Sequence, residues 1–229
     1  MPGKAQAKWR VRAIAIGATL LAVTACGIGL WSARWRAIRA GDSQATRAYG
    51  EGQWAVAAEL ARQTLAVRKD DPAALKLLAR ASARLGRDTA AMAIYQRRLD
   101  EKELEAEDHL LLGLMLLRRG RNDLAGREWK KVLDAGQVSP RSLEELVRLC
   151  VKGRRWEEAI LAADRLSLQP GWEARGSMML GTIRLELNNV PGAAQLFRQA
   201  LELDPAVVDR SHDPTPLRKL IARTFLRTS

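Results

Sequence analysis

Few side chains in this sequence have the types and spacing that catalysis or metal binding requires. The two cysteines, Cys26 and Cys150, form no CxxC motif and lie at no zinc spacing to a histidine. Of the two histidines, His109 follows a run of acids, but carboxylates at the start of a helix are expected to be solvated there and to favour the helix dipole. No nucleophile stands beside a general base. The sequence therefore indicates no catalytic residue, no metal site, no cofactor and no small-molecule substrate.

Basic residues are the most abundant charged groups, and the formal net charge is +12. Two short clusters, "RRGR" (118–121) and "KGRR" (152–155), recur at matched places, where we expect turns. They are interpreted as solvated turn charge, with an acidic partner or lipid headgroups as the alternative. No row of aromatic residues accompanies them, so the pattern does not favour nucleic-acid binding.

The strongest charge asymmetry is at the N-terminus, which predicts a membrane anchor. Residues 1–40 carry seven Lys or Arg and no acid, and residues 13–31, "AIAIGATLLAVTACGIGLW", carry no charge at all. A helix of this length spans roughly 28 Å, close to the apolar core of a bilayer. Trp9 precedes the segment, and Trp31 and Trp35 stand at its far edge, as interfacial anchors would.

Two alternatives to an uncleaved single-pass anchor stay open. The segment could be a cleaved signal peptide, or "VTAC" (23–26) could be a bacterial lipobox, with Cys26 as the lipidated residue. The run "GIGLW" continues the apolar segment past Cys26, which favours the anchor. The basic residues lean towards an N-terminus in the cytoplasm, which would place the remaining chain outside it, in the periplasm.

The elements that must position any binding surface repeat every 34 residues. The spacing is set by five alanines, and most of the positions four residues later hold a large aromatic side chain. The alanines are Ala57, Ala91, Ala125, Ala159 and Ala193, and the aromatics are Tyr95, Trp129 and Phe197. Small residues also recur in the first half of the units, as Ala79, Gly113 and Gly181. A fixed period of this length predicts a solenoid in which small residues admit a neighbouring helix and aromatics fill the space between units.

This pattern resembles the tetratricopeptide repeat family. In "LGTIRLELNNVPGAAQLFRQALELDP" (180–205) the match includes Leu180, Gly181, Ala193, Phe197 and Pro205. The resemblance implies an all-α, right-handed solenoid of about five helix–turn–helix units. The fourth unit departs from the family pattern, with Val147 at the small position and Ala163 at the aromatic one. The first departs too, with Ala61 at its aromatic position.

The predicted organisation divides the chain as follows: a basic tail at 1–12, the anchor at 13–31, a basic linker at 32–37, repeat units at 38–71, 72–105, 106–139, 140–173 and 174–207, and a capping helix and tail at 208–229. We expect the capping helix to begin at Pro214, with Asp213 as its cap, and to present Leu217, Leu220, Ile221 and Leu226 to the last repeat.

A candidate binding surface follows from the geometry of the first helix of each unit. Positions 2, 5, 9 and 12, with 13 added, form one stripe, here called the first-helix stripe. In the family, this stripe lines a concave face that binds peptides. The predicted groove residues are Lys76, Arg80, Arg84, Leu110, Leu114, Leu117, Arg118, Arg148 and Lys152, with Glu144 beside them. The family's Lys–Asn–Arg carboxylate clamp is not matched, since its asparagines are missing.

Together these observations predict a membrane-tethered, non-catalytic scaffold that binds a segment of another protein. A basic and partly apolar stripe would suit an acidic or carboxylate-ended segment that carries apolar side chains. The alternative is a lipoprotein, lipidated at Cys26, that belongs to a bacterial envelope or pilus assembly machine.

Overall fold

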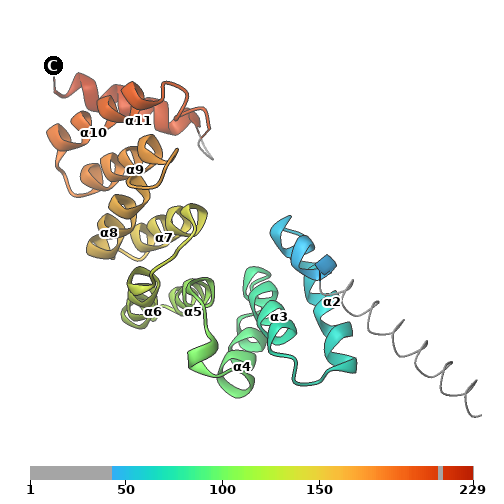
Figure 1. Ribbon diagram of the computed structural model, residues 1–229. Coiled ribbons are helices and arrows are strands. Elements are labelled where there is room, and N and C mark those ends of the chain that lie inside the picture. Colours follow the sequence, from blue (N-terminus) through green and yellow to red (C-terminus); the bar gives the residue numbers. More distant parts are fainter. Residues whose placement is uncertain (1–42, 211–213, 229) are drawn as a thin grey trace, which may run out of the picture. The chain divides into compact units, whose positions relative to one another are not determined.

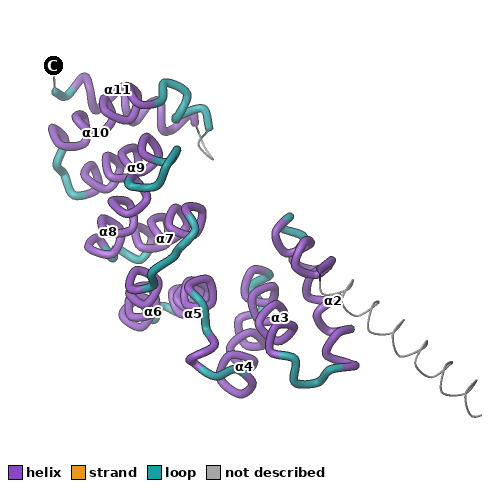
Figure 2. Tube along the Cα trace, in the orientation of Figure 1, coloured by secondary structure: helices purple, strands orange, loops and turns teal. Residues whose placement is uncertain are grey.

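The computed structural model describes residues 43–210 and 214–228, and every regular element in these ranges is a helix. Residues 43–50 are helical, and they precede α2 (Trp54–Val67), α3 (Pro72–Arg84), α4 (Asp88–Arg98), the 3₁₀ helix η1 (Glu101–Glu103), α5 (Ala106–Arg118), α6 (Asn122–Asp134), α7 (Pro140–Lys152), α8 (Trp156–Ser167), α9 (Glu173–Glu186), α10 (Val190–Leu203) and α11 (Pro214–Leu226) (Figures 1 and 2). The all-α prediction is confirmed.

The N-terminal predictions lie outside the described residues. These are the basic tail, the anchor at 13–31, the linker at 32–37 and Cys26; the predicted cap Asp213 also lies outside. Within residues 43–210 and 214–228, no helix is both long enough and apolar enough to cross a bilayer.

The period seen in the sequence sets where helices begin and where the chain turns. The second helices of the five units begin at Trp54, Asp88, Asn122, Trp156 and Val190, one every 34 residues. Two residues before each start, the backbone has a positive φ, at Gly52, Gly86, Gly120, Arg154 and Asn188. Glycine reaches this left-handed region without a steric cost, and asparagine tolerates it better than most residues. The turns between paired helices therefore share one backbone geometry.

The chain forms two compact bodies, residues 43–85 and residues 86–228, which are described separately. In the first body, α2 packs against α3. Its core joins Ala48, Ala57, Ala58 and Ala81, with Tyr49 and Trp54 at the edge. Because these core residues are small, the helices can approach closely with little side-chain volume between them.

In the second body, paired helices stack upon one another in chain order. The pairs are α5 with α6, α7 with α8 and α9 with α10, and α8 also packs on α9 and α6 on α8 (Figure 1). One continuous core runs through these elements, with Trp129, Leu146, Ala159 and Ile183 among its buried members. No pair covers its apolar face alone, so each depends on its neighbour for stability.

Side-chain volume is matched across each pair of helices. A Cβ placed on Gly113 of α5 would stand 2.1 Å from the Trp129 indole of α6, and one on Gly181 of α9 would stand 2.5 Å from the Phe197 ring. Both aromatic residues are completely buried. In the fourth unit the sizes are exchanged, and Val147 and Ala163 are both buried at the equivalent positions. The departure noted in the sequence is thus a compensated pair, which fills the same space from the opposite helix.

The turn that follows α6 is held by one arginine. From α8, Arg165 donates to the carbonyl oxygens of Leu133, Ala135 and Gly136 at 2.7, 2.7 and 2.8 Å. These acceptors lie at the C-terminal end of α6 and in the loop beyond it, where backbone carbonyls lack helical partners. A cation at a helix C-terminus is also favoured by the helix dipole.

The last helix, α11, covers the open end of the repeats, and its contact face includes the predicted Leu217 and Ile221 but not the other two predicted leucines. Its Leu217, Ile221 and Phe225 pack with Phe197 and Val208 in the terminal core. The expectation for Leu220 and Leu226 is wrong, because these side chains are 36% and 79% exposed. The contact face advances by four residues at a time, so Phe225 takes the place that the sequence reading gave to Leu226.

Candidate protein-binding surface

The first-helix stripe of the second body runs over α5, α7 and α9, and α7 contacts both of the other helices directly. Leu114 on α5 is half-buried, and Arg118 at the end of that helix is exposed and pairs with Asp88 at 2.9 Å. On α7, Arg148 and Lys152 are exposed. The structure therefore places these predicted groove residues on adjacent helices, with a leucine beside basic side chains.

Leu110 does not belong to this surface, which corrects the prediction. Its side chain is completely buried in the main core, and its carbonyl oxygen accepts a hydrogen bond from Trp129 Nε1 at 3.4 Å. In α5 and α9, position 5 points into the joint between units, as the buried Met178 at the same place in α9 also indicates, whereas Glu144 at position 5 of α7 keeps part of its surface exposed. Leu117 is half-buried against the same core, so it contributes only part of its surface.

The remaining predicted groove residues, Lys76, Arg80 and Arg84, lie on α3 and belong to the first body. All three are half-buried. Arg84 Nε donates to the Tyr49 hydroxyl at 3.4 Å within that body. The structure thus divides the predicted groove into two sets of residues, each on its own body.

The residues predicted to pack between units are buried. All five period alanines have no exposed surface, and Tyr95 is only 5% exposed. Ala79 is likewise fully buried at the small position of the second unit.

A carboxylate joins the stripe of α7 to the stripe of α9. Glu144 Oε1 accepts from Arg175 Nη2 at 2.6 Å and from Arg175 Nε at 3.0 Å, and it lies 3.8 Å from Arg148 Nη1. Arg175 was missed by the sequence reading, although it holds position 2 of the fifth unit and could have been found there. One acid thus sits between two arginines, and the arginine of α7 keeps half of its side chain exposed.

A cleft of about 650 Å³ opens beside this bridge. It lies between α7, the start of α9 and the chain that follows α10. Trp172 and Ala174 supply apolar wall, while Glu144, Arg175 and an ion pair between Arg210 and Asp204 supply polar wall. The cleft is large enough for one or two side chains of a bound peptide, and its walls combine an indole with charged groups.

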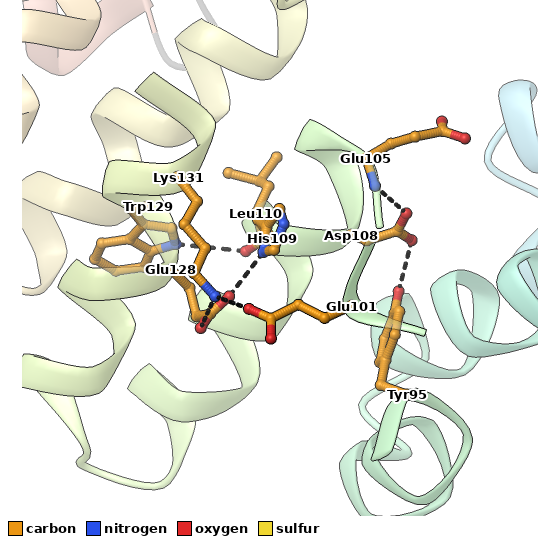
Figure 3. Close-up of polar contacts among 9 residues, drawn as sticks. All are labelled: Tyr95, Glu101, Glu105, Asp108, His109, Leu110, Glu128, Trp129 and Lys131. Atoms are coloured by element: carbon orange, nitrogen blue, oxygen red, sulfur yellow. Dashed lines mark hydrogen bonds and ion pairs between the residues drawn. The ribbon is translucent and has the colours of Figure 1, made fainter. Parts of the chain in front are cut away.

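At the N-terminal end of α5, a second set of polar contacts is structural (Figure 3). Asp108 is completely buried, accepting from the Tyr95 hydroxyl at 3.0 Å and from the Glu105 amide at 2.9 Å. The expectation that this acid is solvated was wrong. Its contact with Tyr95 ties α4 to α5 by a hydrogen bond to a charged group, which is stronger than a neutral one.

His109 lies beside this acid and is paired rather than solvated, which corrects the same expectation. Its Nδ1 is 2.8 Å from Glu128 Oε2, and the other oxygen of Glu128 lies 3.3 Å from Lys131 Nζ (Figure 3). Burial alone would raise the pKa of Glu128, but the hydrogen bond with His109 and the charge of Lys131 more than offset it, so the pKa lies below the ordinary value. A hydrogen bond to Glu101 raises the pKa of Lys131.

These groups are arranged to hold helices together, and we find no reaction geometry among them. Residues 43–210 and 214–228 contain no group of three His, Cys, Asp or Glu side chains that could hold a metal ion. Cys150 is fully buried, and this burial raises the pKa of its thiol far above the ordinary value, so the reactive thiolate is disfavoured. The surface of the described residues carries exposed basic groups, a half-buried leucine and a cleft with an indole wall.

Comparison with known families gives one match. The sequence matches the profile described as "Tetratricopeptide repeat" at residues 43–106 and 110–174, which together exceed half of the chain. A comparison with proteins of curated function gives no match.

Several solved structures share the fold. A structure of MamA (41-end) from Desulfovibrio magneticus RS-1 is 20% identical with a TM-score of 0.57, over 74% of this chain and 96% of that one. The tetratricopeptide protein TTC0263 from Thermus thermophilus is 17% identical with a TM-score of 0.55, over 82% and 99%. YrrB, described as having an unusual peptide-binding site, is 12% identical with a TM-score of 0.52, over 72% and 85%. At these identities the likeness concerns the fold alone.

Proposed function

This chain belongs to the tetratricopeptide repeat family, and on that premise we propose that it is a membrane-tethered, non-catalytic scaffold that binds a segment of another protein along its first-helix stripe. Repeats of this kind fix a fold rather than a partner, so the partner's chemistry must come from the surface itself. The peptide-binding site of YrrB, a protein of the same fold, supports a binding role of this type.

The observation that carries the proposal is the composition of the stripe on α5 and α7. Leu114 lies half-buried, and the exposed side chains of Arg148 and Lys152 stand on the neighbouring helix. Such a surface suits an extended or helical segment that places an apolar side chain on Leu114 and a carboxylate near Arg148. Charge on the partner gives orientation, while apolar burial supplies much of the affinity.

The Glu144–Arg175 ion pair narrows the chemistry that we expect of the partner's segment. Because Glu144 already satisfies Arg175 in the free protein, an incoming carboxylate gains most from Arg148, whose contact with Glu144 is longer and more exposed. The cleft beside Trp172 can then accept a further apolar side chain of the same segment. We therefore propose an acidic or carboxylate-ended segment with at least two apolar residues.

The tether is proposed from the sequence of residues 13–31 and its basic flanks. An N-terminus in the cytoplasm would hold the repeats on the periplasmic side of the membrane. Holding a binding surface at a bilayer restricts its partner to the same compartment and raises the effective concentration for membrane-bound partners.

Photo-crosslinking in intact membranes tests the binding surface. A photoreactive residue at Leu114, or at Arg80 on the first body, is expected to capture a discrete set of proteins. Capture from Leu114 should fall at least about tenfold when Arg148 is reversed to Glu, because one lost charge pair in a partly desolvated groove costs about 1.4 kcal/mol or more.

The controls separate the stripe from the rest of the surface. With the photoreactive residue at Arg80, reversing Lys76 to Glu should reduce capture on the first body. Gln53, which is exposed on a turn, serves as the control position for the crosslinker. Equal capture from Gln53 and from Leu114, with no effect of charge reversal, would contradict the proposal.

The sequence "VTAC" supports a second candidate, a lipoprotein of an envelope or pilus assembly machine that is anchored through Cys26. Metabolic labelling with a radioactive fatty acid distinguishes the two anchors. Label that is lost in Cys26→Ser identifies the lipoprotein, whereas an unlabelled chain that stays in the membrane fraction identifies the spanning helix.

A further inference from the structure

Four exposed basic side chains lie on or beside the turns that join α5 to α6 and α7 to α8. They are Arg119 and Arg121 on the first turn, Arg154 on the second and Lys152 at the end of α7, and we call this set the basic edge. None of the four side chains has a hydrogen bond or an ion pair with another described residue. The basic edge is distinct from the binding surface on Leu114 and Arg148, apart from Lys152, which stands where the two meet.

Direct contacts place the two turns side by side. Arg155 Nη1 of the second turn lies 3.5 Å from Asp123 Oδ1 at the start of α6. A Cβ on Gly126 of α6 would stand 2.8 Å from Arg155 Nε, and one on Gly153 would stand 3.4 Å from Leu117 Cδ1 of α5. The four side chains therefore extend from one edge of the stacked helices.

The positive charge of this edge is only partly compensated by its neighbours. Arg118 pairs with Asp88, and Arg155 pairs with Glu158 at 2.5 Å, so these two bases are neutralised. Within residues 118–123 and 152–157, the acids are Asp123, which reaches Arg155, and Glu157. Four unpaired bases against these two acids leave a net positive surface.

Arg154 holds a backbone conformation that arginine rarely adopts. Its φ is +55°, in the left-handed region, and the equivalent residues of the other four turns are Gly52, Gly86, Gly120 and Asn188. A glycine or an asparagine suits this geometry better than an arginine. A residue held in a disfavoured conformation on an exposed turn points to a role for its side chain.

We propose that the basic edge docks the second body on an anionic phospholipid surface. The turn residues 118–123 and 152–157 include no large exposed apolar side chain, whereas the centre of a protein interface is usually apolar. Lipid phosphates attract clusters of exposed Arg and Lys side chains such as this one. The inference rests on the proposed function in one respect: the anchor at 13–31 would bring the edge to a bilayer.

Vesicles of two compositions and a labelled full-length chain test the proposal. Cys26→Ser with Asn122→Cys places a fluorophore beside the basic edge, because the remaining Cys150 is fully buried. The vesicles are phosphatidylcholine alone or phosphatidylcholine with phosphatidylglycerol, and both carry a lipid with a nitroxide on its headgroup. We expect quenching of the label only on the anionic vesicles, and its loss when the salt is raised from about 0.05 to 0.5 M.

The variant that tests the edge combines Arg119→Gln, Arg121→Gln, Lys152→Gln and Arg154→Gly. The matched control removes four exposed bases elsewhere, through Arg127→Gln, Lys130→Gln, Arg141→Gln and Lys219→Gln. The ratio of docked to undocked protein should fall by about fivefold for each edge base removed, and by much less in the control. Far-UV circular dichroism verifies that both variants remain folded.

The outcomes separate the edge from the anchor. Flotation with phosphatidylcholine vesicles reports the anchor alone. A chain that fails to float with them but is quenched on anionic vesicles would contradict the proposed membrane anchor and support lipid docking by the basic edge. Equal quenching on both vesicles, or no change in the edge variant, would overturn the proposal. Protection of the label by polyglutamate without quenching on anionic vesicles would assign the edge to an acidic protein instead.

Discussion

Replacing Gly113 by alanine tests the packing between paired helices at a single atom. The new Cβ would stand 2.1 Å from Trp129 Nε1 and 2.5 Å from Cδ1, whereas ordinary contacts begin at 3.4 Å. The indole would have to retreat by roughly 1.3 Å, and it is completely buried, so its surroundings must move with it.

The expected loss in the free energy of unfolding on Gly113→Ala has three contributions. Overpacking a dense core costs about 1–3 kcal/mol. Displacing the indole also loses the Trp129 hydrogen bond to the Leu110 carbonyl, at about 1 kcal/mol, while alanine gains about 1 kcal/mol over glycine in helix propensity. Gly113→Ala should therefore lower the free energy of unfolding by about 1–3 kcal/mol, measured by urea unfolding with circular dichroism.

A double variant tests whether the two positions share one volume. Gly113→Val with Trp129→Ala copies the Val147 and Ala163 pair of the next unit. Trp129→Ala alone should cost about 3–5 kcal/mol, and the added valine should recover part of it, for a coupling energy of about 2–3 kcal/mol.

Gly136→Ala is the control, since a Cβ there meets nothing within 4 Å, and its effect should stay within about 0.5 kcal/mol. A Gly113→Ala protein as stable as the unmodified chain, or strictly additive energies in the double variant, would show that Gly113 and Trp129 do not share one packing volume.

Three further predictions concern the turns and the charged contacts. Arg154→Gly should raise the free energy of unfolding by about 0.5–1 kcal/mol, because its φ of +55° suits glycine, and Gly120→Ala at φ +70° should lower it by about 1 kcal/mol; urea midpoints compare the two. Arg165→Ala should lower the free energy of unfolding by about 2–3 kcal/mol, because three carbonyl oxygens lose the guanidinium that donates to them. Arg165→Lys should recover less than half of this loss, because an ammonium cannot reproduce the planar fork of arginine. A lysine variant as stable as the unmodified chain would contradict this. The lowered pKa of Glu128 makes its contribution to stability complete above the ordinary value of 4.5 and lost as the pH falls through the lower folded value. Between pH 6 and pH 3, the free energy of urea unfolding should therefore fall less for Glu128→Gln than for the unmodified chain. Equal falls would show that the Glu128 carboxylate does not contribute to the acid sensitivity.

The period in the sequence predicted the helices well, for a physical reason. Each turn between paired helices needs the same left-handed residue, and each pair needs a small residue opposite a large one, so the constraints recur every 34 residues. The exchange of Val147 and Ala163 looked like a departure, because a pattern read one position at a time does not register that volume is conserved across two helices.

The candidate surface was less predictable, since side-chain direction depends on the neighbouring unit. Leu110 holds a stripe position but points into the joint, and Asp108 sits in an acidic run yet is buried by its bond to Tyr95. The pairing of Glu144 with Arg175 spans 31 residues, close to one period. Such contacts arise from stacking, which a single unit's helical periodicity does not encode.

If a partner binds along the first-helix stripe, a crosslinking profile along α7 will follow the period of that stripe. A photoreactive residue would be placed at each position from 140 to 152 in the full-length chain in membranes. We expect capture to peak at 141, 144 and 152, to fall at 148 where the photoreactive residue replaces the arginine that the partner contacts, and to be absent at the buried positions 143, 146, 147 and 150. A flat profile, or stronger capture from the exposed Leu161 of α8, would contradict the claim.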